Sequence, residues 1–140
     1  MSDSCLLPEF DPAECADIAH RLFALEGSLK LLYGERDLNY LITTDSGKFV
    51  FKIANADEAR GMLDCQHRVF ERLEQNQVFP LIACARKSVN DREIETVQDA
   101  QGREHFCRVL PYLEGRMWSE FKISSPELLQ DLGANLATLD

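Results

Sequence analysis

Lys52 is the residue whose type and position point most directly to chemistry. It stands in the middle of residues 48–54, KFVFKIA, which are otherwise almost continuously apolar. A lysine is rarely buried without a partner, so a lysine inside such a strand needs a counter-charge or an anionic ligand. The alternative is that its ammonium group reaches solvent at the edge of a sheet while its alkyl chain stays buried.

A long helix follows this strand and turns a second polar residue, Gln66, inward. Apolar residues recur at intervals of three and four, which is typical of one helix face. Asn55, with Glu58 three residues later, is the expected N-cap of this helix. If the helix packs on the strand before it, Gln66 and Lys52 would meet in one layer. The apolar members of the face are Ala59, Met62, Leu63, Val69, Phe70 and Leu73.

A third polar group lies in the segment 33–39, YGERDLN, between two expected strands. This segment is either a solvated turn or a loop that offers backbone N–H groups and Arg36 to a phosphate. It contains one glycine, Gly34, which is a weaker signal for phosphate binding than a glycine-rich motif.

Composition narrows the function classes. The chain has 140 residues, enough for one domain with a core, and 45% hydrophobic and 28% charged residues are ordinary for a soluble protein. The net charge of -9 and the absence of a basic cluster argue against a nucleic-acid partner. The sequence shows neither a signal peptide nor an apolar run of about 18 residues, so we expect a cytoplasmic protein that does not bind membranes.

The cysteines and histidines predict neither a disulfide framework nor a metal site. The five cysteines are odd in number and include no C-x-x-C pair, so reduced thiols are expected. The three histidines are far apart in sequence, and none has a metal-ligand spacing, so no metal site built from protein ligands alone is expected. We interpret His20 as a surface or boundary residue and His105 as an outward strand residue.

The elements that would position Lys52 can be read from caps and turns. A helix over 11–25 is capped by Asp11 with Pro12 and Glu14, and Gly27 is expected to end it. Turns are expected at 45–47 and 99–102. The expected strands cover residues 28–33, 38–44, 48–54, 81–87, 92–98 and 104–110. This order predicts an α+β domain with an antiparallel sheet of about five strands and a packed helix.

The last part of the chain reads as a connector that leaves the sheet. Pro111 ends a strand that should lie inside the sheet, and Gly115 permits a change of direction. Trp118 and Phe121 are expected to cover this connector. A final helix begins at Ser125 and Pro126, and its leucine stripe has little left to pack on, so we expect the chain to be part of a longer protein. That stripe is Leu129, Leu132, Leu136 and Leu139.

Five segments together carry a resemblance to a known family, through their order and spacing. They are residues 32–42, 49–55, 63–73, 107–116 and 132–140. They resemble the N-terminal, nucleotide-binding lobe of the aminoglycoside phosphotransferase and choline kinase superfamily, and within it the hydroxylysine kinase-like branch. Related domains are fused to class III aminotransferases in bacteria. The resemblance covers nearly the whole chain, and no single motif in it is decisive.

The resemblance implies roles for individual residues in ATP binding. Gly34, Arg36 and Asn39 belong to the loop that covers the ATP phosphates, and Lys52 matches the lysine that holds the α- and β-phosphates. Gln66 stands where the family usually has a glutamate that pairs with this lysine. The amide can accept a hydrogen bond from the ammonium group but brings no charge.

The resemblance also implies an adenine pocket. Val50 would line it, Leu110 would guard its back, and Pro111, Tyr112 and Leu113 would form the hinge. In that hinge the carbonyl of Pro111 would accept from the adenine amino group, and the N–H of Leu113 would donate to the ring. The missing N–H of Pro111 does not affect this role.

The catalytic machinery of the family lies in its second lobe, as a His-x-Asp segment, a downstream Asn and a metal-binding Asp. No His-x-Asp occurs in this chain. The resemblance therefore divides the chain into an N-terminal lobe, 1–115, and a connector with the first helix of a C-terminal lobe, 116–140. It implies ATP and Mg²⁺ as cofactors, with no catalytic residue and no metal ligand in this chain.

Three functional hypotheses follow. The complete protein would transfer the γ-phosphate of ATP to a hydroxyl group of a small amine-bearing metabolite, such as an amino alcohol or a hydroxylated amino acid. Alternatively, the lobe is a non-catalytic regulatory or interaction module, or it begins a multidomain protein with a class III aminotransferase. A further hypothesis is that a truncated lobe self-associates through Trp118, Phe121 and the leucine stripe.

Overall fold

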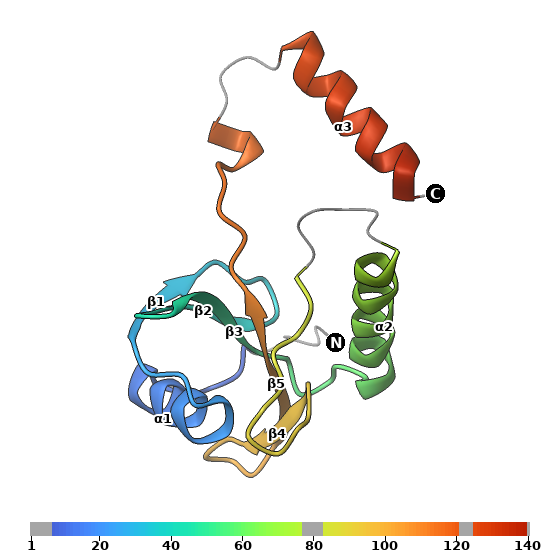
Figure 1. Cartoon of the computed structure of the whole chain (residues 1–140). Coiled ribbons are helices and arrows are strands. Elements are labelled where there is room, and N and C mark those ends of the chain that lie inside the picture. Colours follow the sequence, from blue (N-terminus) through green and yellow to red (C-terminus); the bar gives the residue numbers. More distant parts are fainter. Residues whose placement is uncertain (1–6, 77–82, 121–124, 140) are drawn as a thin grey trace, which may run out of the picture.

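The computed structural model describes residues 7–76, 83–120 and 125–139, and these contain one antiparallel sheet of five strands in the order β1-β2-β3-β5-β4 (Figure 1). The strands are β1 (Ser28–Leu32), β2 (Leu38–Thr44), β3 (Gly47–Ile53), β4 (Glu95–Gln98) and β5 (Glu104–Pro111). The helices are α1 (Pro12–Phe23), α2 (Arg60–Gln75) and α3 (Pro126–Leu139), with a short 3-10 turn at Trp118–Glu120. The predicted α+β class and antiparallel sheet are confirmed.

Helix α1 begins as its sequence predicts. The Asp11 carboxylate accepts from the N–H of Glu14 at 2.8 Å, and the Glu14 carboxylate accepts from the N–H of Asp11 at 2.8 Å, which is a capping box. The expectation that Gly27 ends this helix is wrong. The helix ends at Phe23 because Ala24 adopts a left-handed conformation, with φ 51° and ψ 41°, and donates its N–H to the carbonyl of His20.

Gly27 serves a different purpose from the one expected. A Cβ at this position would lie 2.0 Å from the carbonyl oxygen of Thr43, so only glycine permits the chain to pass this close to β2. This close passage lies where the chain leaves α1 and enters β1.

Helix α1 covers one face of the sheet, which we call the α1 face. Phe51 and Ile53 of β3 and Val109 of β5 point to it, and all three are fully buried. The ring of Phe23 packs edge-on against Phe51, with centroids 6.2 Å apart. The buried cluster on this face also contains Cys15, Ile18, Ala19, Leu25, Tyr40, Ile42, Val97 and Cys107.

Helix α2 lies beside the opposite face, near the ends of β3 and β5 (Figure 1). The prediction that Asn55 and Glu58 start this helix is wrong. The Asn55 side chain accepts from the N–H of Asp57 at 2.9 Å and its carbonyl accepts from the N–H of Glu58 at 3.0 Å, so residues 55–58 form a turn. The helix begins at Arg60, with Ala59 as its N-cap.

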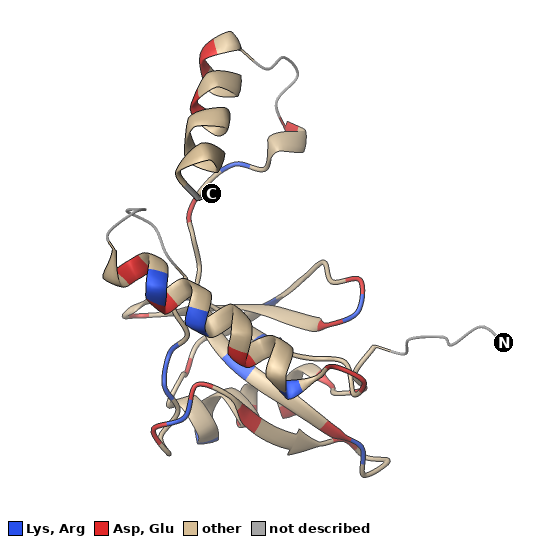
Figure 2. Ribbon diagram, turned by 90° about the vertical axis from the view of Figure 1, so that its right-hand side faces the viewer, with Lys and Arg blue, Asp and Glu red and all other residues tan. Residues whose placement is uncertain are grey.

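The buried side of α2 is narrower than the predicted apolar face. Leu63 and His67 are its buried residues, whereas Met62 and Val69 are 56% and 50% exposed. Leu63 packs with Ala54, Ile94 and Phe106 in a small second cluster. Figure 2 shows acidic and basic residues interspersed along the outer side of this helix.

The strand predicted over 81–87 does not form within the described residues 83–87, and a turn over 88–94 precedes β4. Residues 81 and 82 lie outside the described residues, and among residues 83–87 only Arg86 forms an isolated bridge, to Val109. The carboxylate of Glu95 accepts from Ser88 at 2.6 Å and from Asn90 at 2.8 Å. These bonds close residues 88–94 into a turn, so β4 begins only at Glu95.

After β5 the chain leaves the sheet, and both views show α3 standing away from it (Figures 1 and 2). Helix α3 begins at Pro126, as predicted, and Ser125 accepts from the N–H of Leu128. Leu129, Leu132 and Leu136 are 52%, 43% and 55% exposed, as is Trp118 at 44%. Phe121 and the side chain of Leu139, which the sequence placed with them, lie outside the described residues.

Candidate functional site

Lys52 lies in the middle of β3, on the sheet face opposite α1. Residues opposite one another in neighbouring strands share a face. The register pairs Lys52 with Asn39 of β2 and with Arg108 of β5, and it pairs Val50 with Leu110 beside them. We call the surface formed by these five residues the lysine face.

The ammonium group of Lys52 is held where the connection between β1 and β2 enters β2. Its Nζ donates to Oδ1 of Asn39 at 2.7 Å and lies 3.7 Å from Oδ2 of Asp37. The side chains of Lys52 and Asp37 are 22% and 25% exposed, so both lie largely out of water. The need for a partner, inferred from the strand, is thus met by Asn39 and Asp37. Because β3 is an interior strand, Lys52 has no sheet edge at which to reach solvent.

The β1–β2 connection is closed by contacts among its own residues. The amide of Asn39 donates to the carbonyls of Tyr33 and Asp37 at 3.4 Å each. The Asp37 carboxylate accepts from the N–H of Asn55 at 3.3 Å, which ties the connection to the end of β3. Gly34 is required here, because a Cβ would lie 2.1 Å from the carbonyl oxygen of Asp37. Arg36 lies in the same connection with its side chain exposed.

The predicted adenine-pocket residues lie along the same two strands. Val50 and Leu110 are partly buried and directly opposed on the lysine face, next to Lys52. Pro111 is the last residue of β5 and pairs with Phe49. The structure therefore brings Val50, Lys52 and Leu110 together, with Pro111 at the end of the same strand.

The predicted hinge is tied to the start of β3. Tyr112 donates its N–H to the carbonyl of Lys48 at 3.0 Å, and the ammonium of Lys48 lies 5.9 Å from the centroid of the Tyr112 ring. The same ammonium forms an ion pair with Glu114. Leu113, between these contacts, is 45% exposed.

Gln66 does not meet Lys52, so the expected contact between these two residues is wrong. Its Oε1 accepts from Nη2 of Arg108 at 2.9 Å instead. The reason is that Arg108 lies next to Lys52 on the face that α2 approaches and takes the amide as its own acceptor. Helix α2 is thus bound to the sheet through β5, and Lys52 is bound to the β1–β2 connection.

His67, next to Gln66 on α2, completes the surroundings of Arg108. Its Nε2 lies 3.1 Å from Nη1 of Arg108, and its Nδ1 lies 3.0 Å from Oε2 of Glu93. An arginine has only donors. His67 must therefore accept at Nε2 and carry its proton on Nδ1, from which it donates to Glu93.

The charges on the lysine face act on one another. Burial lowers the pKa of Lys52, the Asp37 carboxylate counteracts this, and the neighbouring charge of Arg108 lowers the pKa further. Burial also lowers the pKa of Arg108, against the opposing effects of Asp37 and Glu58. An anion placed between these cations would stabilise the charged forms of both buried groups. A pair of cations so placed is suited to binding phosphate.

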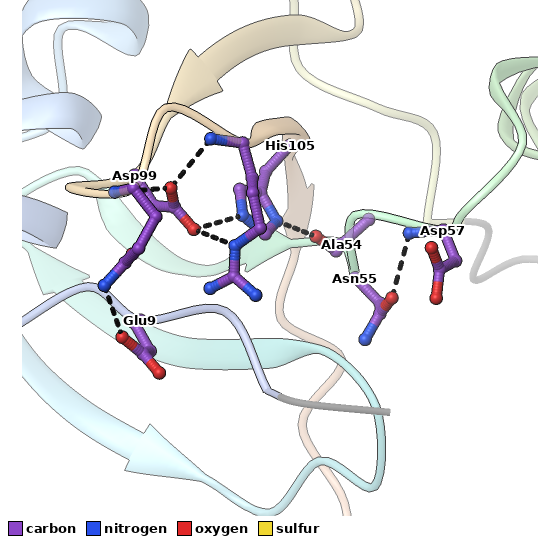
Figure 3. A network of polar contacts seen from close by, with 8 residues as sticks. Glu9, Ala54, Asn55, Asp57, Asp99 and His105 are labelled. Atoms are coloured by element: carbon purple, nitrogen blue, oxygen red, sulfur yellow. Dashed lines mark hydrogen bonds and ion pairs between the residues drawn. The ribbon is translucent and has the colours of Figure 1, made fainter. Parts of the chain in front are cut away.

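A second polar network lies at the end of the α1 face (Figure 3). Nε2 of His105 lies 3.1 Å from the Asp99 carboxylate, and its Nδ1 lies 2.9 Å from the carbonyl oxygen of Ala54. Asp99 also accepts from the N–H groups of Gln101 and Arg103 and from the Arg103 side chain. His105 is 2% exposed, so its interpretation as an outward residue is wrong.

Hydrogen bonding governs the protonation of Asp99. Burial alone would raise the pKa of Asp99, but the bonds from the Arg103 amide, from His105, from the Arg103 side chain and from the Gln101 amide together bring it well below its usual range. The network joins the β4–β5 turn to the end of β3. It contains none of the residues predicted to bind ATP.

Four residues of the lysine-face surroundings were missed by the sequence analysis: Asp37, His67, Glu93 and Arg108. Arg108 could have been found, because it is a cation inside the strand 104–110 that was expected to lie within the sheet, a signal like the one that singled out Lys52. Asp37 lay inside the loop already suspected of binding phosphate. No local signal marks His67 or Glu93, since their pairing depends on how the turn before β4 meets α2.

Other binding features are few within the part of the chain that the structure describes. No group of three or more His, Cys, Asp or Glu side chains there is placed to hold a metal ion, and its four cysteines are free thiols. No described helix is long and apolar enough to cross a membrane. A hollow of about 540 Å³ near Gly27, Thr44 and Arg86 includes none of the predicted ATP-binding residues.

Residues 30–140 match the model of a phosphotransferase enzyme family. The chain belongs to this family. The match begins within β1, extends through α3 and therefore contains the whole lysine face. A search of curated proteins found no match.

Solved structures support the fold of a phosphotransferase lobe. One match is amicoumacin kinase in complex with AMP-PNP, Ca²⁺ and amicoumacin (TM-score 0.66, 17% identity, 76% of this chain and 32% of that chain). Another is a microcompartment-associated aminopropanol kinase (TM-score 0.69, 14% identity, 92% and 39%). A third is a spectinomycin phosphotransferase with ADP and spectinomycin (TM-score 0.64, 8% identity, 92% and 37%). The chain thus spans between 32% and 39% of the length of these proteins.

Proposed function

We propose that this chain is the ATP-binding lobe of a small-molecule kinase, with residues 1–115 as the N-terminal lobe and 116–140 as the connector and first helix of a C-terminal lobe. The observation that carries this proposal is the position of Lys52. Its ammonium group projects from the middle of the lysine face and is held at the β1–β2 connection by Asn39 and Asp37. A fixed cation beside a closed loop suits the α- and β-phosphates of ATP.

The remaining predicted residues would hold the rest of the nucleotide. Val50 and Leu110 would contact the adenine ring, because they form an apolar pair on the same face as Lys52. Pro111 would accept from the adenine amino group and Leu113 would donate to the ring, with Tyr112 between them. Gly34 and Arg36 would cover the phosphates from the β1–β2 connection.

Mg²⁺ would accompany the ATP phosphates and neutralise charge on them. We assign it no ligand in this chain, because the described residues form no acidic cluster suited to a metal. In the complete protein the γ-phosphoryl group would pass from ATP to a hydroxyl oxygen of the acceptor, giving ADP, a phosphate ester and a proton.

For the acceptor we propose an amine-bearing metabolite, either an amino alcohol or a hydroxylated amino acid. The hydroxylysine kinase-like resemblance supports this class. So does the likeness to a kinase named for aminopropanol, which is an amino alcohol. The choice between the two acceptor types rests with residues outside the lysine face.

The experiment that tests the proposal compares Lys52→Ala with Lys87→Ala in the intact protein. Lys87 is an exposed lysine paired with Asp91, is not one of the lysine-face residues, and serves as the matched control. We expect Lys52→Ala to remain folded by circular dichroism, to weaken MgATP binding at least about tenfold in calorimetry, and to abolish phosphorylation of ethanolamine and hydroxylysine. Lys87→Ala should behave as the unsubstituted protein.

Two results would separate the alternative functions. An intact protein that neither binds ATP nor phosphorylates any acceptor would favour a regulatory or interaction module. A protein mass large enough for a second enzyme would favour fusion to a class III aminotransferase. Unchanged turnover in Lys52→Ala would refute the role given to Lys52.

A further inference from the structure

Arg108 lies directly beside Lys52, one strand away on the lysine face. Side chains opposed in this way have Cβ atoms about 4.5–5.5 Å apart, and like charges so placed repel one another. Arg108 is only 7% exposed, so water screens little of this repulsion. The two cations therefore need partners that keep them apart.

Those partners are divided between two elements. Lys52 binds Asn39 and Asp37 on the β1–β2 side. Arg108 binds Gln66 and His67, both on α2. Each cation has its own set of acceptors, and the two sets lie on different elements.

The acceptor set of Arg108 extends beyond α2. Because Nε2 of His67 must accept from Arg108, the ring is neutral and donates from Nδ1 to Glu93. The carboxylate of Glu93 thereby fixes the tautomer of His67, in the manner of a carboxylate that orients a catalytic or metal-binding histidine. The hydrogen bonds from Arg108 to His67 and from His67 to Glu93 thus join strand β5, helix α2 and the turn before β4.

We propose that Arg108 is a positioning residue for Lys52: it ties α2 to the sheet in place of a lysine–carboxylate pair, and its guanidinium directs the ammonium of Lys52 toward the β1–β2 connection. This inference deepens the proposed function and rests on it, since ATP phosphate is the anion that Lys52 would meet there. Gln66 is then not a weakened partner of the lysine but an acceptor for the guanidinium.

The chemistry of arginine suits this role better than that of lysine. A guanidinium presents several N–H groups in one rigid plane, so it can donate to Gln66 and His67 at the same time. It also stays charged when buried, so it continues to repel Lys52. This repulsion is one reason why the pKa of Lys52 is lowered, after burial.

The first test is a measurement on the unsubstituted protein. ¹⁵N NMR of the histidine rings in the intact protein reports which nitrogen of His67 carries the proton, with His67→Gln used for assignment. We expect the proton on Nδ1. A proton on Nε2 would overturn the proposal, because Arg108 would then have no acceptor on this ring.

The second test measures the pKa of Lys52 by NMR of labelled lysine, assigned with Lys52→Arg. We expect the pKa of Lys52 to rise in Arg108→Met and to stay lowered in Arg108→Lys, which keeps the charge. Amide hydrogen exchange in α2 should become faster in both variants, because neither can bind Gln66 and His67 together. Arg68→Met, which removes an exposed arginine of α2, should change neither readout.

An equal pKa of Lys52 in the unsubstituted protein and in Arg108→Met would overturn the proposal. Should Arg108→Met fail to fold, Arg108→Lys and Glu93→Gln carry the test. Glu93→Gln keeps an oxygen that can accept from Nδ1 of His67 but removes the charge, so it should speed exchange in α2 while Arg108 holds the tautomer. Unchanged exchange in α2 would contradict the role given to Glu93 and His67.

Nucleotide titrations separate this inference from the proposed function. We expect Arg108→Met to weaken MgATP binding roughly tenfold, because a misplaced Lys52 would lose about one charge-assisted contact with phosphate. Adenosine has no phosphate, so its binding should be unchanged. An equal loss for both ligands would mean that Arg108 only supports the fold. If the unsubstituted protein binds no MgATP while the pKa of Lys52 still responds to Arg108, the proposed function fails and the effect of Arg108 on Lys52 stands.

Discussion

The α1 face and the lysine face belong to the same strands, yet they are held together in different ways. The α1 face is filled by apolar side chains such as Phe51, Ile53 and Val109, which pack against α1. On the lysine face, Asn39, Lys52 and Arg108 stand in one row across three strands, and each is hydrogen-bonded. One face obtains its stability from burial of surface, and the other depends on matched donors and acceptors.

This difference suits the α1 face to stabilising the fold and the lysine face to binding a ligand. A tightly packed apolar face loses free energy wherever a methylene group is removed. On a polar face, a change at an exposed group lowers the free energy of unfolding little. Its hydrogen bonds can pass to a ligand, since a ligand can replace Asn39 or Asp37 as the acceptor of Lys52. The substitutions below test this comparison, from the largest expected effect to the smallest.

Phe51→Ala should produce the largest effect, because Phe51 is fully buried and packs against Phe23. We expect it to lower the free energy of unfolding by about 3–5 kcal/mol. The control is Val50→Ala, the preceding residue on the same strand, which points to the lysine face and is partly exposed. Denaturant unfolding of both variants is the measurement, and equal losses would contradict the division into two faces.

Asp99→Asn tests the polar exception on the α1 face, the network with His105 and Arg103. The bonds that lower the pKa of Asp99 make its carboxylate stabilising above the pKa of an unfolded aspartate, about 3.9. That contribution is lost as pH falls toward the lower pKa of the folded state. We expect Asp99→Asn to unfold at a lower temperature at pH 7, and the difference from the unsubstituted protein to shrink below about pH 4.

The control for this pH dependence is Glu104→Gln, which removes an exposed carboxylate at the start of β5. Its thermal unfolding should follow the unsubstituted protein at every pH. A difference for Asp99→Asn that is the same at pH 3 and pH 7 would argue that the amide disturbs packing and that charge is not the cause.

The α1 face was predictable because its signals are local. The capping box of Asp11 and Glu14 fixes where α1 begins, and the spacing of Cys15, Ile18 and Phe23 fixes which side is buried. The alternation in β3 likewise assigns Phe51 and Ile53 to one side and Lys52 to the other. Two errors fell at element ends, at Gly27 and Asn55, where the outcome depends on contacts with distant residues such as Thr43 and Asp37. A third was His105, whose inward position is fixed by its bonds to Ala54 and Asp99.

The lysine face was predictable only in part. The sequence shows that Lys52 needs a partner, but the choice between Gln66 and Asn39 depends on the β2–β3 register and on a second cation from β5. Since Arg108 lies far from Lys52 in the sequence, no local periodicity connects the two. Gln66 reaches the sheet through its bond to Arg108, but the residue is exposed and its predicted partner was wrong.

The smallest effect on stability, with a clear effect on the proposed binding, is expected for Gly34→Ala. The new Cβ would meet the carbonyl oxygen of Asp37 at 2.1 Å and Nδ2 of Asn39 at 2.5 Å, so the β1–β2 connection must shift and Asn39 must loosen its hold on Lys52. Because the closest contact is with a backbone atom, we expect a loss of about 1–2 kcal/mol in unfolding free energy and a several-fold weaker affinity for MgATP.

Gly61→Ala is the matched control for this substitution. No atom lies within 4 Å of the new Cβ, and the position is inside α2, where alanine is favoured over glycine by up to about 1 kcal/mol. We therefore expect Gly61→Ala to stabilise the protein slightly and to leave MgATP affinity unchanged, as measured by calorimetry beside Gly34→Ala. If Gly34→Ala bound MgATP as tightly as Gly61→Ala, the β1–β2 connection would not be the phosphate loop. The acceptors of Lys52 would then serve only the fold.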